Sequence, residues 1–223
     1  MRRASFMLAL LSALLFALAQ PVAAGNIFNF SGKVAVAQWS LGDAQNTSVF
    51  VSGFEGSFQS PPGRPFQATN VFVGVSQYFC DAVQDELVFR GYSGFEPAPD
   101  ALRISGTLTN ASVSDASLTL FGSETRYADC ANPTNPTFNN LGPFVVALSA
   151  NWTGNGQLVR TRSTSSFDAG PDCKFFFRFD GTSRQATATG SITGQLNLGA
   201  LGTTGFANMV STRNSTLQIG NGC

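Results

Sequence analysis

The sequence of 223 residues contains no histidine. Without an imidazole, the chain cannot carry a Ser-His-Asp triad or a Cys-His pair, so these nucleophilic enzymes are excluded. The same absence excludes zinc, copper and non-haem iron sites that depend on histidine ligands.

Charge is also scarce. Charged residues make up 12% of the chain, about half of the ~25% usual in soluble domains. The 13 basic residues balance 13 acidic ones, and two of the basic residues are lysines. This balance offers no basic surface for nucleic acid. The 21 phenylalanines argue against a disordered chain, because disordered segments contain few aromatic residues.

The N-terminus predicts a secretory signal peptide over residues 1–24. Two arginines precede the apolar run Phe6–Ala19, and small residues stand at the −3 and −1 positions of a cut after Ala24. The run is short for a membrane span, and no second long apolar run follows it. We therefore expect a secreted protein, periplasmic or extracellular, with residues 25–223 as a single domain and no membrane span after cleavage.

Four cysteines remain in the mature chain: Cys80, Cys130, Cys173 and Cys223. In an exported protein an even number of cysteines predicts disulfides, here two. Of the three possible pairings we favour Cys80–Cys130 with Cys173–Cys223, since the second would fix a free terminus. No C-x-x-C pair indicates a redox motif or a zinc knuckle.

Period-two patterns predict an all-β fold. Val71, Val73 and Val75 alternate with Phe72 and other residues of the opposite face. No stretch of the mature chain shows helical spacing over three turns. We expect an antiparallel β-sandwich or barrel of about 10–12 strands.

Two dipeptides predict hairpins. Asn155-Gly156 suits a type I′ turn that would place Trp152 opposite Val159. A second turn at Asp180-Gly181 would place Arg184 opposite Phe177, on an apolar face. An unpaired charge there would be costly, so a sheet rim, a carboxylate partner or a bulge is expected.

Two segments lack an obvious strand pattern. Residues 122–143 contain three prolines and Cys130, and we expect a long irregular segment there. Residues 60–67 are expected to form a surface loop.

The carboxylates offer no catalytic pair. A glycosidase needs two carboxyl groups on either side of the scissile bond, and no spacing among the acidic residues singles out such a pair. Asp168-Ala169-Gly170 stands alone where an aspartic protease would need two Asp-Thr/Ser-Gly elements. We expect no cofactor and favour a protein that is not an enzyme.

Calcium is the metal that best suits an exported chain without histidine. Asp81, Asp85 and Glu86 follow Cys80 closely and are candidate ligands, and Asp168 and Asp172 precede Cys173. Neither group matches the D-x-D-x-D-G loop, so a solvated turn is the alternative interpretation.

Aromatic residues suggest a binding surface. Tyr92 and Tyr127 lie in turn-like contexts and are candidate ligand contacts, whereas Trp39 and Trp152 are expected in the core. The predicted function is extracellular binding of a glycan or a protein, or a structural role at a surface. The alternative is a carbohydrate-active enzyme or a calcium-dependent carbohydrate-binding module.

Overall fold

A computed structural model describes residues 27–59, 63–168 and 174–219. The predicted signal peptide lies outside these ranges, as do Cys173 and Cys223, so the second disulfide stays a prediction. The described residues include no helix long and apolar enough to cross a lipid bilayer.

The described residues form ten strands, which confirms the all-β prediction. They are β1 (Ile27–Ser40), β2 (Ser48–Gln59), β3 (Phe66–Asp81), β4 (Glu86–Pro97), β5 (Leu102–Ile104), β6 (Asn110–Ala128), β7 (Thr134–Gly154), β8 (Val159–Asp168), β9 (Lys174–Gly194) and β10 (Gly199–Ile219).

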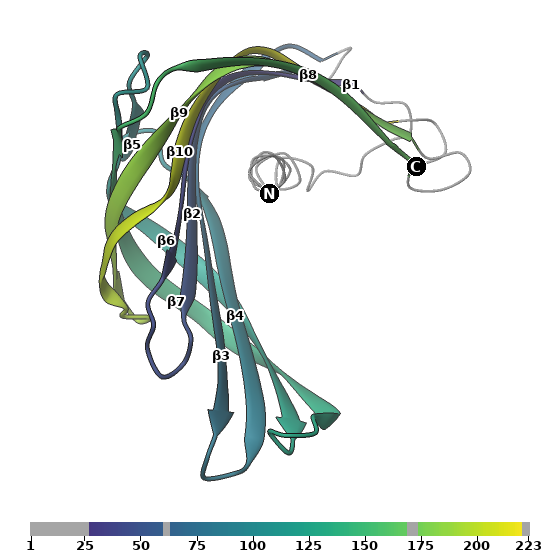
Figure 1. Cartoon of the computed structure of the whole chain (residues 1–223), viewed down its shortest axis with the longest axis vertical. Helices are drawn as coiled ribbons and strands as arrows, with labels where there is room; N and C mark the ends of the chain where they lie inside the picture. Colours follow the sequence, from purple (N-terminus) through teal and green to yellow (C-terminus); the bar gives the residue numbers. More distant parts are fainter. Residues whose placement is uncertain (1–26, 60–62, 169–173, 220–223) are drawn as a thin grey trace.

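All ten strands belong to one antiparallel sheet that closes on itself (Figure 1). The hydrogen-bonded order is β10-β1-β2-β3-β4-β6-β7-β9, and β9 pairs in turn with β10. β5 and β8 lie off this ring, paired with β6 and β9. The fold is therefore a single closed sheet and not the two stacked sheets of a sandwich.

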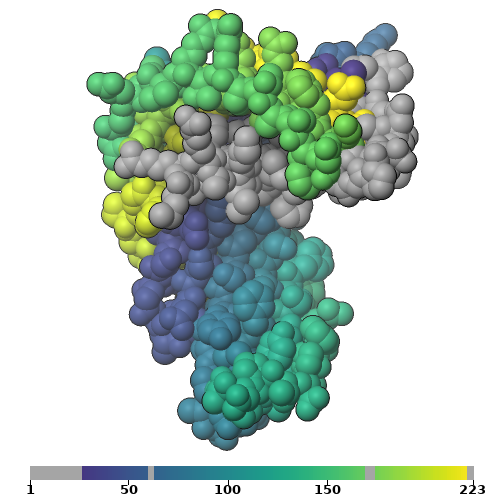
Figure 2. Space-filling model, turned by 45° about the vertical axis from the view of Figure 1, so that its right-hand side comes forward, coloured from purple at the N-terminus to yellow at the C-terminus, as the bar shows by residue number. Residues whose placement is uncertain are grey.

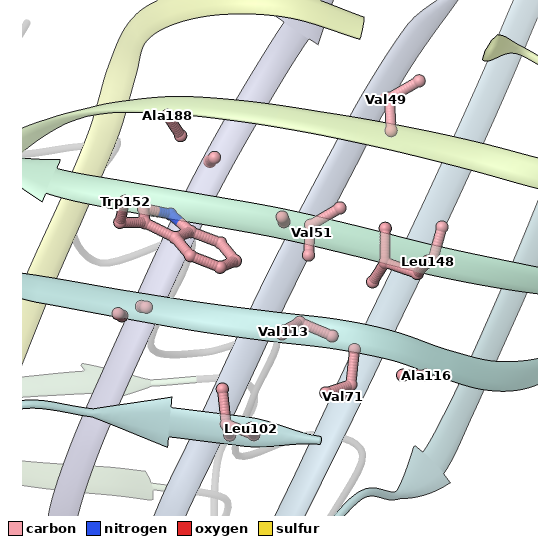
Figure 3. Close-up of a cluster of buried hydrophobic side chains, with 14 of the residues drawn as sticks. Val49, Val51, Val71, Leu102, Val113, Ala116, Leu148, Trp152 and Ala188 are labelled. Atoms are coloured by element: carbon pink, nitrogen blue, oxygen red, sulfur yellow. The ribbon is translucent and has the colours of Figure 1, made fainter. Parts of the chain in front are cut away.

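One face of every ring strand points into a shared apolar core (Figure 3). Val71, Val73 and Val75 are buried there, while Tyr78 on the opposite face of β3 is half exposed. The predicted alternation of β3 is confirmed, because successive side chains of a strand point to opposite faces.

Both tryptophans lie in this core, as predicted. Trp152 is 1% exposed and Trp39 is 2% exposed. The indole N–H of Trp152 donates to the Val36 carbonyl at 2.9 Å, and that of Trp39 donates to the Gly202 carbonyl at 3.3 Å. Each ring therefore contributes apolar area without leaving its polar atom unpaired.

The short strand β5 pairs with residues 111–113 of β6, on the edge of β6 that pairs with β4 farther along, and its Leu102 packs in the core. A Cβ atom on Gly53 would lie 2.6 Å from Leu102 Cδ1, so the lack of a side chain at position 53 lets Leu102 pack against β2. Leu102 and Leu108 are both fully buried.

Several strands are longer than the ring and extend past it as two arms (Figures 1 and 2). We call one the disulfide arm; it comprises residues 77–81, 86–92, 122–128 and 134–142 of β3, β4, β6 and β7. We call the other the phenylalanine arm; it comprises 27–34, 54–59, 66–70, 159–168, 174–183 and 210–219 of β1, β2, β3, β8, β9 and β10.

The hairpin predicted at Asn155-Gly156 is wrong. β7 and β8 do not pair; they follow one another along the same edge of β9, where Trp152 lies opposite Ala188 and Val159 lies opposite Ser183. Residues 155–158 therefore connect two strands that lie end to end along β9. Val159 is 54% exposed and does not belong to the core.

The turn predicted at Asp180-Gly181 is also wrong. β9 runs without interruption through both residues, and a Cβ atom on Gly181 would clash with the Ser211 carbonyl oxygen. Arg184 consequently lies opposite Met209 and not opposite Phe177. Position 181 needs glycine because a neighbouring backbone approaches it closely, and not because the chain turns there.

The irregular segment predicted over 122–143 is mostly strand. β6 continues to Ala128 and β7 begins at Thr134, so five residues remain for the turn. Pro136 and Pro143 each lie at a register shift of the β6–β7 pairing, and the other edge of β7 pairs with β9 only from Val146 to Gly154. Bulges and unpaired edges are the places where a sheet tolerates proline. Of the predicted loop 60–67, the described residues 63–65 lie outside the strands, and Phe66 and Gln67 already belong to β3.

Candidate functional site

The disulfide arm is closed at its tip by Cys80–Cys130, which confirms one of the two predicted disulfides. Their Cα atoms lie 5.8 Å apart. The bond joins the end of β3 to the turn between β6 and β7, so it links strands that are separated by β4 in the sheet. This arm therefore presents a braced surface on each of its two faces.

The inner face of the arm, which continues the inside of the ring, carries a network of ion pairs. Glu124 is 6% exposed and accepts from Arg90 Nε at 2.5 Å and from Arg126 Nε at 2.7 Å. Arg126 Nη1 also donates to Glu86 Oε2 at 2.8 Å. The Arg90 guanidinium in addition lies 5.2 Å from the centre of the Phe79 ring.

These contacts keep Glu124 ionised. Hydrogen bonds from Arg126, and then from Arg90, lower its pKa from 4.5 to about 2, against the opposing effect of burial. The hydrogen bonds to Glu124 and Glu86 raise the pKa of Arg126. A carboxylate held this firmly in the charged form is a poor general acid near neutral pH, so the network is better suited to structural support.

The three calcium candidates do not converge on one point. Asp81 and Glu86 lie opposite each other in the β3–β4 pairing, but the Arg126 guanidinium lies against both, at 3.8 Å and 2.8 Å. A cationic side chain thus already pairs with two of the candidate ligands. Among the described residues, one group of three side chains brings its possible ligand atoms within 4.8 Å of one another. It consists of Asp85, Cys80 and Cys130, and the two cysteines are already joined in the disulfide.

The outer face of the arm carries a row of exposed aromatic rings. Tyr78 lies opposite Phe89, Phe89 opposite Thr125, and Thr125 opposite Phe138, so these four residues form one continuous row across β3, β4, β6 and β7. The exposed fractions are 50% for Tyr78, 46% for Phe89 and 74% for Phe138. Directly opposite residues point to the same face, so the three rings share one side of the sheet.

Small polar residues form the next row toward the ring. Ser76, Gly91, Ser123 and Asn140 lie opposite one another in that order. The row on the other side, toward the tip, contains Leu87 opposite Tyr127. Tyr127 is therefore on the aromatic face and half-buried, although in a strand and not in the predicted turn.

Tyr92, the other predicted ligand contact, does not lie on the aromatic face. It lies in β4 on the inner face, is 7% exposed, and packs edge-on against Phe144 with 5.4 Å between ring centres. Burial raises the pKa of its hydroxyl. The expectation of an exposed turn at Tyr92 is wrong, since its ring belongs to the core and not to the surface.

A separate pocket of about 260 Å³ lies where β4 leads toward β5. Glu96, Asp100 and Asp115 line it together with apolar residues such as Val71 and Leu118. Asp115 occupies a bulge of β6 and has φ of 50°. This pocket was not foreseen, because the three acidic residues are widely spaced in the sequence.

Phe89 and Phe138 were also missed as surface residues. Tyrosine and tryptophan are the usual stacking side chains for sugars, so the phenylalanines gave no signal by type, and Phe138 lies in the segment expected to be irregular. The alternation of each strand could have identified two rings of the aromatic row. Tyr78 faces the side of β3 opposite to buried Val75, and Phe89 faces the side of β4 opposite to buried Val88.

The chain matches no protein-family model, no curated protein and no solved structure.

Proposed function

We propose that this chain is an exported protein that binds an extracellular polysaccharide, without catalysis, through the outer face of the disulfide arm. The observation that carries the proposal is the row formed by Tyr78, Phe89 and Phe138, three exposed rings on one side of a braced sheet. Contiguous exposed apolar groups on a soluble protein often mark an interaction site.

A sugar chain presents apolar C–H faces and polar hydroxyl groups, and the aromatic row and the polar row next to it suit one of these each. Flat aromatic rings pack against the C–H faces of pyranose rings, and burying these faces removes apolar area from water. The neighbouring row of Ser76, Ser123 and Asn140 offers hydroxyl and amide groups to sugar hydroxyls. The row crosses four strands, so it extends over more than one sugar unit at ~4.8 Å per strand.

Export supports an extracellular ligand. The predicted signal peptide over 1–24 would direct the chain out of the cytoplasm, and the disulfide Cys80–Cys130 is typical of oxidising compartments. The inner face of the arm would hold the platform in place through the ion pairs of Glu124. Binding on a preformed sheet needs little ordering of the protein.

The test is retention on insoluble cellulose, chitin and peptidoglycan. The mature protein is mixed with each polymer, and the free fraction is measured after sedimentation. We expect retention by at least one polymer, weakened about tenfold or more in the double variant Phe89→Ser/Phe138→Ser. Phe206→Ser serves as the matched control, because Phe206 is 83% exposed on β10, outside the arm.

Two results would contradict the proposal. One is the absence of retention by all three polymers; the other is equal retention of the double variant and the wild type. A melting curve for each variant shows whether the fold is kept.

The alternatives have their own readouts. Calcium-dependent sugar binding through Asp81, Asp85 and Glu86 predicts that a chelator abolishes retention, and that added calcium raises the melting temperature. Carbohydrate hydrolysis at the pocket of Glu96, Asp100 and Asp115 predicts release of reducing sugar that Glu96→Gln removes.

A further inference from the structure

The strand β8 presents a sheet edge without a partner among the described residues. All ten residues Val159–Asp168 pair with β9, from Val159 opposite Ser183 to Asp168 opposite Lys174. No described strand pairs with the other edge of β8. Its outward N–H and C=O groups are therefore available to another strand.

β8 has only part of the usual protection of such an edge, the charged side chains Arg160, Arg162 and Asp168. It contains neither proline nor lysine, and its pairing with β9 shows no bulge. The unpaired edge of β7, by contrast, contains Pro136 and Pro143. Prolines, bulges and charged side chains, above all lysine, hinder edge-to-edge association of sheets. β8 has neither a proline nor a bulge, so it is a better edge for association than β7.

The charges of β8 are arranged for pairing with an antiparallel copy of itself. Arg160 and Arg162 lie near the start of the strand and Asp168 lies at its end, all on the same face. Arg162 is held by Asp180 at 2.9 Å, whereas Arg160 contacts Asp180 at 3.4 Å and its side chain is 61% exposed. Arg160 therefore remains available for a second carboxylate.

We infer that two copies of this chain associate through β8, which pairs with itself antiparallel about a two-fold axis at Thr164. A two-fold axis perpendicular to the sheet keeps each face continuous, so residues pair with residues of the same face. Centring the axis at Thr164 places Arg160 of each copy opposite Asp168 of the other. In this register, residues 160–168 of the two copies pair, and the Arg160–Asp168 ion pair forms twice.

The neighbouring registers satisfy fewer of these conditions. An axis at Ser163 would place Asp168 opposite residue 158 of the second copy, which lies outside β8. An axis at Ser165 would pair only residues 162–168 and leave Arg160 unpaired. With the axis at Thr164, the exposed Phe167 lies opposite Thr161 of the second copy. Pairing of this kind covers part of an apolar ring that is 65% exposed in the single chain.

The inferred register can be tested by cysteine cross-linking. Thr164 of one copy would lie directly opposite Thr164 of the other, at a Cα separation of about 4.5–5.5 Å. That range permits a disulfide. Ser166 of the two copies would be offset by about 13 Å along the strands, too far for a bond. Both residues are exposed on the same face of β8, which makes Ser166→Cys the matched control.

We expect Thr164→Cys to form a covalent dimer under mild oxidation, as seen on a non-reducing gel, and Ser166→Cys to form no covalent dimer. Equal cross-linking of the two variants, or none in Thr164→Cys, would overturn the inference.

A second experiment measures mass in solution by light scattering over a concentration series. The wild type is expected to approach twice the mass of one chain as concentration rises. Asp168→Arg should shift the series to the monomer, and the exchange Arg160→Asp/Asp168→Arg should restore the dimer. Arg64→Asp changes the charge of an exposed loop residue far from β8 in sequence and should leave the series unchanged. A wild type that stays monomeric throughout would refute the association.

Discussion

The two arms are extensions of one sheet, yet different interactions hold each arm together. β3 begins at Phe66 in the phenylalanine arm and ends at Asp81 in the disulfide arm. At its first end, rings cluster: Phe54 lies 4.8 Å from Phe30 and 4.7 Å from Phe58 between ring centres. At its other end, a disulfide and a charge network take this role.

The difference shows that a long strand need not be stabilised uniformly. Phe30, Val34 and Phe54 form an apolar cluster on the face opposite the main core, where Phe54 is 6% exposed. The disulfide arm places its charge network on the inner face, together with Phe79 and Tyr92, and Tyr78, Phe89 and Phe138 on the outer face, which leaves the aromatic row available for contact. The contrast predicts that the arms respond to different perturbations.

The largest effect is expected from Phe54→Ala in the phenylalanine arm. Removing a buried ring leaves a cavity among Phe30 and Phe58, and we expect a loss of about 3–5 kcal/mol in the free energy of unfolding. Urea denaturation measures it. Phe66→Ala is the control, because Phe66 is 57% exposed and its loss should cost about 1 kcal/mol or less. Equal losses for the two variants would contradict the assignment of Phe54 to a packed cluster.

Removing the disulfide should act on the other arm. For Cys80→Ser/Cys130→Ser we expect a loss of about 2–4 kcal/mol, since the bond closes a loop of sequence separation 50. Hydrogen exchange should rise in 77–92 and 122–142 while 27–34 and 54–59 keep their protection. If protection falls evenly over both arms, the arms are not independent.

A smaller loss is expected for Glu124→Gln. The substitution removes the charge that Arg90 and Arg126 share, but both arginines are about one-quarter exposed, so water compensates in part. We expect about 2 kcal/mol, measured by urea denaturation. Glu55→Gln, a single surface-accessible pair with Lys33, is the matched control and should lose less.

The mildest perturbation is acid. The lowered pKa of Glu124 means that its stabilising contribution is complete above pH 4.5 and is lost as pH falls toward about 2. Hydrogen exchange in the disulfide arm should therefore increase over that interval. The ring cluster of Phe30, Phe54 and Phe58 contains no titratable group and should not share this dependence. In Glu124→Gln the acid response of the arm should be reduced.

The sequence predicted the part of the fold that follows from strand period. The alternation of Val71, Val73 and Val75 depends only on local geometry, and so does the face that Trp152 shares with Leu148 and Ala150. Closure of the sheet depends on which strands pair, and nothing in the local pattern of β9 shows that it pairs with β7, β8 and β10. Gly181 illustrates the limit: a turn and a close backbone contact both favour glycine, and sequence does not distinguish them.

The candidate site was less predictable, for a related reason. Tyr127 was identified as a ligand contact, and it lies on the aromatic face, but the row itself needs the pairing of four strands. Phe89 and Phe138 are 49 positions apart in sequence numbering and share a row only because Thr125 lies opposite both. The calcium site stays a prediction, but Arg126, from a distant strand, forms ion pairs with two of its three candidate ligands, and sequence could not show this.

The pairing of β1 with β10 has a consequence for the time course of folding. Ile27 lies opposite Gln218, so the first described strand finds its second neighbour only in the last one. Contacts this distant in sequence form slowly, and the sheet cannot close before β10 has been synthesised. Until then β1 exposes an open edge.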